Sequence, residues 1–75
     1  MYKEQALRLI ADEHTRARQV LKFAPFHDYH QAHSIILEEL DELWADIKGK
    51  QNPEDLQAEA TQLGAMVLSF LIDLC

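Results

Sequence analysis

The sequence predicts an all-α fold of three helices that assembles into an oligomeric helical bundle. Apolar residues recur at helical spacing over three long stretches, and no stretch has the alternation typical of a strand. Three of the four prolines and glycines lie between these stretches, where they separate the helices. With 75 residues the chain is interpreted as one small domain, residues 1–75, whose core needs help from a metal or another copy.

The first predicted helix runs from about residue 3 to residue 22. Glu13 lies in the middle of its apolar stripe, where an unpartnered carboxylate is expensive to bury. One interpretation makes Glu13 a further metal ligand, or an acid that supports the ligands. The alternative is an ion pair with Arg16 or Lys22.

The second predicted helix begins at Tyr29 or Gln31 and ends at residue 48, after a linker that contains Pro25. Proline disfavours helical geometry at the residue before it, so the linker separates the two helices. Asp28 is a suitable N-cap for the second helix, and Gly49 is expected to end it in the C′ role.

The third predicted helix runs from about residue 53 to residue 74, with Asn52 as N-cap and proline at N1. After Leu63 it is apolar nearly all round, and a helix that is hydrophobic on every side must be buried. We therefore expect a second copy of the chain to pack against this helix and form a dimer or tetramer. Leaving it uncovered would exceed the apolar surface that soluble monomers usually expose.

The composition restricts the classes of partner. A formal net charge of -6 argues against a nucleic acid polymer, which is bound through clustered Lys and Arg, but it permits a single nucleotide with its own Mg²⁺. The single cysteine, Cys75, excludes an internal disulfide and a zinc site made of cysteines. The N-terminus does not have the pattern of a signal peptide, and no apolar run reaches the roughly 20 residues of a membrane span. We expect a soluble, cytoplasmic protein with no membrane partner.

Acidic residues gather on the flank of the second helix. At about 100° per residue, three of them fall together beside the apolar stripe: Glu38, Glu39 and Glu42. Glu59 has the corresponding position on the third helix, so Glu39 and Glu59 border the same seam if the apolar stripes pack together. Crowded carboxylates repel one another, and carboxylate oxygens are preferred ligands of Mg²⁺ and Mn²⁺. The sequence thus favours a divalent cation here, with a solvated acidic face as the alternative.

The segment from residue 33 to residue 42, preceded by Pro25 and Asp28, resembles the signature of MazG-like all-α nucleoside triphosphate pyrophosphohydrolases. Those enzymes carry an E-E-x-x-E motif on one helix and an E-x-x-D motif on the next. The first motif is matched in full by Glu38, Glu39 and Glu42. Glu59 matches the first position of the second motif, and Gln62 stands where the family has its aspartate.

The resemblance covers about residues 24–74 and implies a house-cleaning hydrolase that cleaves between the α- and β-phosphates of an NTP or dNTP. It implies Mg²⁺ or Mn²⁺ as the cofactor and four metal ligands, one of them available as a general base: Glu38, Glu39, Glu42 and Glu59. Gln62 removes a full charge but keeps an oxygen donor. The alternative function is therefore a catalytically inactive oligomerisation or interaction module with the same fold.

Further residues are candidates for contacts with the substrate or with a second metal. His30 and His33 could bind zinc from adjacent helical turns, although no matching fourth ligand is present, or they could lie at the mouth of a nucleotide pocket. Lys22 could offer charge to phosphates. Phe26 and Trp44 could stack on a base, with packing as the more ordinary role of these rings.

Overall fold

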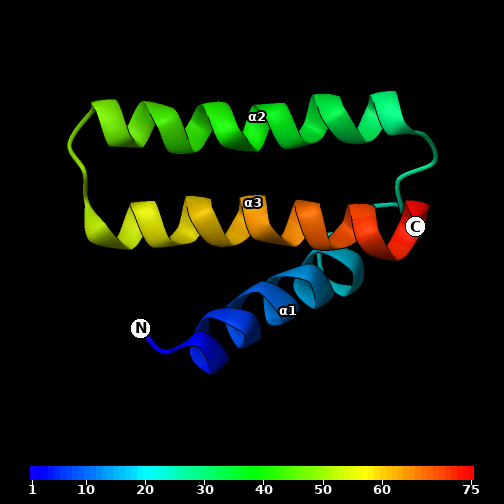
Figure 1. Cartoon of the computed structure of the whole chain (residues 1–75), viewed down its shortest axis with the longest axis horizontal. Helices are drawn as coiled ribbons and strands as arrows, with labels where there is room; N and C mark the ends of the chain where they lie inside the picture. Colours follow the sequence, from blue (N-terminus) through cyan, green and yellow to red (C-terminus); the bar gives the residue numbers. More distant parts are fainter.

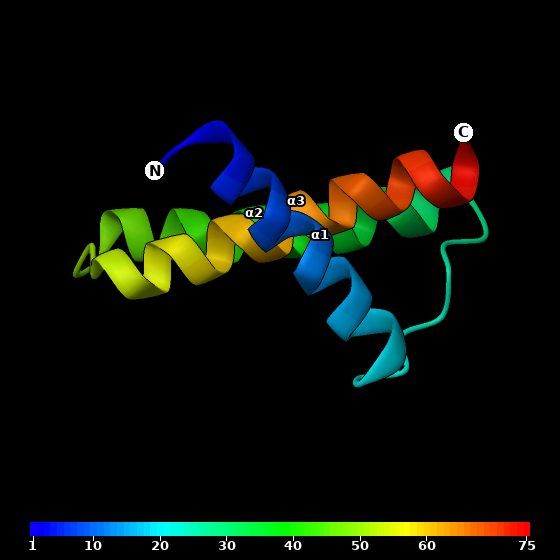
Figure 2. The same ribbon diagram turned by 90° about the horizontal axis from the view of Figure 1, so that it is seen from below.

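The computed structural model describes all 75 residues and contains three α-helices and no strand, which confirms the all-α, three-helix part of the prediction. The helices are α1 (Lys3–Gln19), α2 (Tyr29–Lys48) and α3 (Pro53–Leu74). α2 and α3 run antiparallel and side by side, and α1 crosses α3 obliquely (Figures 1 and 2). None of the three helices has both the length and the apolar character that crossing a membrane requires.

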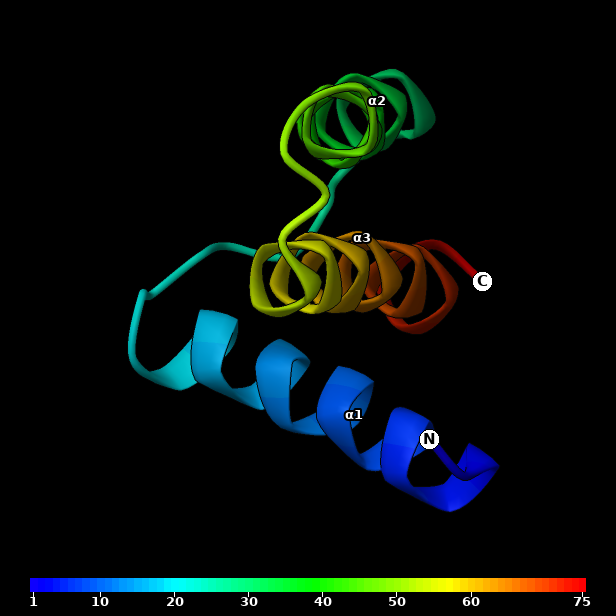
Figure 3. The same ribbon diagram turned by 90° about the vertical axis from the view of Figure 1, so that its left-hand side faces the viewer.

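α3 is the central helix of the fold. It contacts α1 on one side and α2 on the other, as the view along the helices shows (Figure 3), and no Cα of α1 lies within 8 Å of one in α2. Side chains from all three helices can therefore meet only along the edges of α3. One of these edges carries the candidate site.

The predicted N-caps of α2 and α3 are confirmed. The carboxylate of Asp28 accepts a hydrogen bond of 2.7 Å from the backbone N–H of Gln31. The side-chain oxygen of Asn52 accepts from the N–H groups of Glu54 and Asp55 at 2.9 and 3.1 Å. Each cap satisfies backbone donors that have no partner within the helix, so local chemistry alone fixes where these two helices begin.

Two predicted helix ends need correction. α1 ends at Gln19, before the expected end at Lys22, because Lys22 takes a left-handed φ of 60° that a continuing helix excludes. Gly49 follows α2 as expected, but its φ is -93°, and the left-handed conformation belongs to Gln51 with φ 54°. The small size of Gly49 suits the close packing at this point, since a Cβ there would lie 3.1 Å from the carbonyl oxygen of Ala45.

The core is small and is built mainly from small side chains. Five residues are buried: Ala17, Phe26, Ala32, Ala65 and Ser69. Gly64 lets α1 approach α3, because a Cβ at this position would lie only 2.8 Å from Cδ1 of Ile10. Four of the five buried residues are alanine or serine, so the helices meet closely.

A buried carboxylate fastens the linker, residues 20–28, to the end of α3. Asp73 forms an ion pair with Arg18 of α1 and also accepts a 2.9 Å hydrogen bond from the backbone N–H of Phe26. The same arginine reaches the hydroxyl of Ser69 at 3.5 Å. This arrangement holds the linker over one end of the candidate site.

Apolar side chains remain exposed on the two antiparallel helices. We call five of them the apolar flank: Leu40, Trp44 and Ile47 of α2 with Val67 and Leu71 of α3. At about 100° per residue, Trp44 lies on the opposite side of α2 from Glu42, and Leu71 lies on the opposite side of α3 from Gln62. Leu40 and Ile47 belong to the apolar stripe of α2, which the sequence predicts to be buried. This stripe therefore faces α3 only in part.

Candidate metal centre

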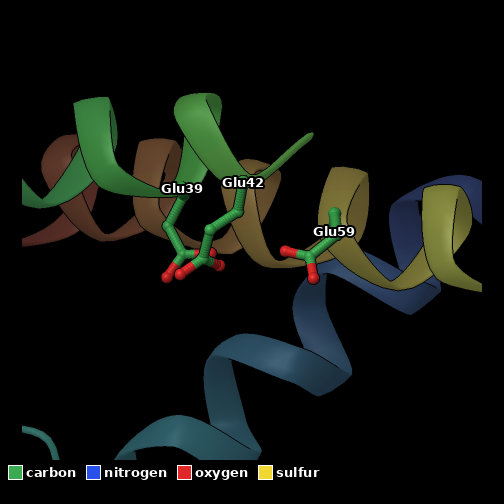
Figure 4. Close-up of side chains that lie close together, drawn as sticks. All are labelled: Glu39, Glu42 and Glu59. Carbon is green, nitrogen blue, oxygen red and sulfur yellow. The ribbon is translucent and has the colours of Figure 1, made fainter. Parts of the chain in front are cut away.

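Three carboxylates from two helices converge beside α3 (Figure 4). Glu39 and Glu42 come from adjacent positions on one face of α2, and Glu59 comes from α3. One carboxylate oxygen of each residue lies within 4.8 Å of the corresponding oxygen of the other two. We call these three residues the acid cluster. The antiparallel packing of α2 and α3 brings it together from positions well separated in sequence.

The surroundings of the acid cluster disfavour ionised carboxylates. Burial raises the pKa of Glu39 above its usual value, and the neighbouring charges of Glu42, Glu59 and Glu38 raise it further. Burial is also the main cause that raises the pKa of Glu59, followed by its interactions with Glu42. Burial and the neighbouring negative charges both disfavour the ionised carboxylates. The three side chains of the acid cluster therefore repel one another when all of them are ionised.

Two oxygens of the acid cluster have no partner in the protein. Oε2 of Glu39 and Oε2 of Glu59 are almost wholly inaccessible to solvent, and neither accepts a hydrogen bond. Polar atoms in this situation cost free energy unless they are satisfied by another group. A hard divalent cation would provide that group, and a set of carboxylate oxygens matches the ligand preference of Mg²⁺ and Mn²⁺.

A cavity of about 280 Å³, which we call the acid groove, lies between α1 and α2 along α3. α2 contributes Glu39 and Glu42, and α1 contributes Glu13 and Arg16. The remaining lining residues are Ala17, Leu21, Phe23, Gln62 and Met66. Gln62, which the sequence places at the family's aspartate position, thus lies in the same cavity as two members of the acid cluster.

A second cavity, the linker pocket, has a volume of about 330 Å³ and adjoins the acid groove. The two cavities share Ala17, Phe23, Glu39 and Met66. The linker pocket also contains Phe26 and Ile35, so much of its wall is apolar. A ligand with a charged part and a flat apolar part would find both environments next to each other.

Glu38 is exposed and is not part of the three-way approach of carboxylates. It lines the linker pocket instead. Consecutive residues on a helix point about 100° apart, so Glu38 and Glu39 cannot both face the same seam directly.

Glu13 forms the ion pair that the sequence left as an alternative to metal ligation. Its carboxylate accepts hydrogen bonds from Arg16 at 2.8 Å from Nε and 2.6 Å from Nη2. These hydrogen bonds lower the pKa of Glu13 and keep it ionised. Sequence reasoning did not select Arg16 as a site residue. The available signal was a basic residue three positions after an acid on the buried face of a helix.

The remaining candidates lie away from the acid cluster. Lys22, His30 and His33 are exposed, and none of them lines the acid groove or the linker pocket. The acid cluster is the sole group in which three His, Cys, Asp or Glu ligand atoms come close together, so no histidine belongs to such a group. Trp44 is exposed with the ammonium group of Lys48 over its ring at 5.3 Å.

No family model matches the chain, and neither curated proteins nor solved structures give a match. The resemblance to MazG-like pyrophosphohydrolases therefore remains a prediction that depends on the motif residues.

Proposed function

We propose that the chain is a Mg²⁺- or Mn²⁺-dependent nucleoside triphosphate pyrophosphohydrolase, which converts an NTP or dNTP to the monophosphate and pyrophosphate. The observation that carries this proposal is the acid cluster, in which carboxylates from two helices converge and leave two buried oxygens without partners. The acid groove and the linker pocket adjoin this cluster. The volume of the linker pocket, about 330 Å³, is at the lower end of the range typical of small-molecule sites, and the acid groove adds about 280 Å³ next to it.

The roles of the residues follow from their positions. Glu39, Glu42 and Glu59 would hold the cation, which would neutralise phosphate charge and make an attacking water more acidic. The acid groove receives the phosphates, and Gln62 offers them an amide donor. Glu38 is the motif carboxylate outside the cluster, so it is free to accept a proton from the water.

The test is release of pyrophosphate from a panel of NTPs and dNTPs, with Mg²⁺, with Mn²⁺ and with EDTA, and with the products identified by phosphorus NMR. We expect metal-dependent formation of monophosphate and pyrophosphate by wild type. The control variant Asp41→Asn removes an exposed charge from α2 and should be as active as wild type. Glu39→Gln should reduce the rate to background because it removes a ligand. No release by folded wild type, or equal rates in Glu39→Gln, would contradict the proposal.

We also propose that the protein is a homo-oligomer, a dimer or tetramer, in which a second copy covers the apolar flank. Trp44 is 52% exposed and Leu71 is 57% exposed, and burying these large apolar side chains against a second copy would be favourable. Sedimentation should show association that Trp44→Gln weakens. Leu7→Gln, which removes an equally exposed leucine from α1, should leave it unchanged. A monomeric wild type would contradict this part of the proposal.

The second candidate function is a catalytically inactive oligomerisation or interaction module. It is favoured by the apolar flank together with Gln62 at the position of the family's aspartate. This alternative predicts oligomers that release no pyrophosphate. Gln62→Asp would then restore hydrolysis if the missing charge is the cause of inactivity.

A further inference from the structure

The wall of the acid groove that belongs to α1 carries a single cation, Arg16. α1 and α2 lie on different sides of α3 (Figure 3), so Arg16 and the acids of α2 approach the groove from different walls. Two other basic residues are engaged elsewhere, since Arg18 pairs with Asp73 and Lys48 lies over an aromatic ring. We infer that Arg16 binds the phosphate groups of the substrate across the acid groove, and that Glu13 positions its guanidinium group.

The guanidinium group has an unused edge. It carries five N–H donors in a fixed plane. The Glu13 carboxylate accepts from Nε at 2.8 Å and from Nη2 at 2.6 Å. The two N–H groups of Nη1 and the second N–H of Nη2 have no partner in the protein. These donors form the edge that matches two oxygens of one phosphate, so Arg16 can bind phosphate without releasing Glu13.

Glu13 is suited to positioning because it is fixed and stays ionised. Its side chain is 14% exposed, whereas that of Arg16 is 47% exposed and accessible to a ligand. A single carboxylate that grips one edge of the guanidinium orients the other edge. This role also gives the ion pair on the apolar face of α1 a purpose beyond neutralising a buried acid.

The ion pair also determines how the phosphate would be held. Seen from far away, the negative charge of Glu13 cancels the positive charge of Arg16. The attraction between Arg16 and a phosphate would therefore come from short hydrogen bonds more than from a long-range electrostatic field. The inference rests on the proposed function, because it assigns the substrate's phosphates to the acid groove. It predicts that salt weakens the contact less than it would weaken one made by an unpaired arginine.

The probe is inorganic tripolyphosphate with Mg²⁺, titrated calorimetrically into full-length protein, because it presents phosphates without a base. Arg16→Gln should weaken binding by at least about tenfold, the effect expected for a charge-assisted pair of hydrogen bonds. Arg8→Gln is the matched control. It removes the same charge from an exposed position on α1 outside the acid groove, and it should change binding by less than about twofold. Arg16→Lys should recover part of the loss, since it keeps the charge without the paired donors.

Binding of Mn²⁺ without phosphate separates a contact from a structural role. Arg16→Gln should keep the Mn²⁺ affinity of wild type, because the acid cluster remains intact. Joint loss of Mn²⁺ and tripolyphosphate binding would mean that Arg16 maintains the shape of the site, and this would overturn the inference. Equal binding of tripolyphosphate by Arg16→Gln and Arg8→Gln would also overturn it, as would no binding by wild type.

Hydrolysis distinguishes failure of this inference from failure of the proposed function. If wild type hydrolyses a triphosphate and Arg16→Gln has the same kcat/KM, the function stands and the assignment of Arg16 is wrong. If tripolyphosphate binding depends on Arg16 but wild type hydrolyses no triphosphate, the phosphate contact stands and the proposed activity is wrong.

Discussion

Replacing Glu39 by glutamine should stabilise the protein when divalent cations are absent. The carboxylates of the acid cluster lie within 4.8 Å of one another. Two unit charges 4.8 Å apart repel by about 3.5 kcal/mol at an effective dielectric constant of about 20, and by about 0.9 kcal/mol in bulk water. The cluster is partly exposed to water, so the lower end applies. We expect Glu39→Gln to raise the free energy of unfolding by about 1 kcal/mol in EDTA.

A bound cation should reverse this order of stability. A ligand present at about a hundred times its Kd stabilises the folded state by about 2.7 kcal/mol. Glu39→Gln removes a ligand atom, so wild type should gain most of this free energy and the variant little of it. Wild type should therefore be the less stable protein in EDTA and the more stable one in Mg²⁺ or Mn²⁺.

The assay is urea unfolding followed by circular dichroism, for both proteins, in EDTA and in a series of cation concentrations. Asp41→Asn is the control, because it removes an exposed charge from α2 outside the acid cluster and should respond to cations like wild type. Two results would refute the reasoning. One is a Glu39→Gln protein that is less stable than wild type in EDTA, and the other is an equal gain from cations in both proteins.

Three further predictions concern pH and packing. Without cations, stability should fall as pH rises from about 4.5, the ordinary Glu value, through the raised pKa values of Glu39 and Glu59, because the fold favours their protonated forms. Urea unfolding across this range checks the decline, and a rise in stability would contradict it. Gly64→Ala should cost about 1 kcal/mol, because its Cβ would lie 2.8 Å from Cδ1 of Ile10 and the clash exceeds the gain in helix propensity. Ile10→Ala removes both Cδ1 and Cγ1, which would lie 2.8 and 2.9 Å from the new Cβ, so the double variant should be more stable in thermal unfolding than the sum of the two single changes predicts. A stabilised Gly64→Ala single variant would show that α1 moves away freely. Asp73→Asn should destabilise by about 2–3 kcal/mol, since it breaks a partly buried ion pair. Hydrogen exchange should then become faster at the backbone amide of Phe26, which donates to Asp73. Unchanged exchange would contradict the role of Asp73 in holding the linker.

The parts of the fold that depend on local chemistry were predictable. Asp28 and Asn52 mark the starts of α2 and α3, because their side chains cap backbone groups a few residues away. The end of α1 was not predictable in this way. The left-handed turn at Lys22 interrupts a stripe that stays apolar through Leu21. The Arg18 and Asp73 pair joins residues too far apart in sequence for any spacing rule.

The candidate site shows the same division. Helical spacing placed Glu39 and Glu42 together and set Glu59 at the matching position of the next helix, and the structure brings these three side chains to one place. Helical spacing did not predict that Glu38 lies outside the acid cluster. Its position depends on how α2 is rotated about its own axis relative to α3. The position of Arg16 in the acid groove depends on the angle at which α1 crosses α3, which the sequence pattern does not specify.

The most direct test of the central claim is equilibrium binding of Mn²⁺, followed by the electron paramagnetic resonance signal of the free ion. The claim is that acids from α2 and α3 share one cation, so Glu39→Gln and Glu59→Gln should each weaken binding by at least about tenfold, while Asp41→Asn should not. Folded wild type that binds no Mn²⁺, or binding that survives loss of Glu59, would contradict the claim.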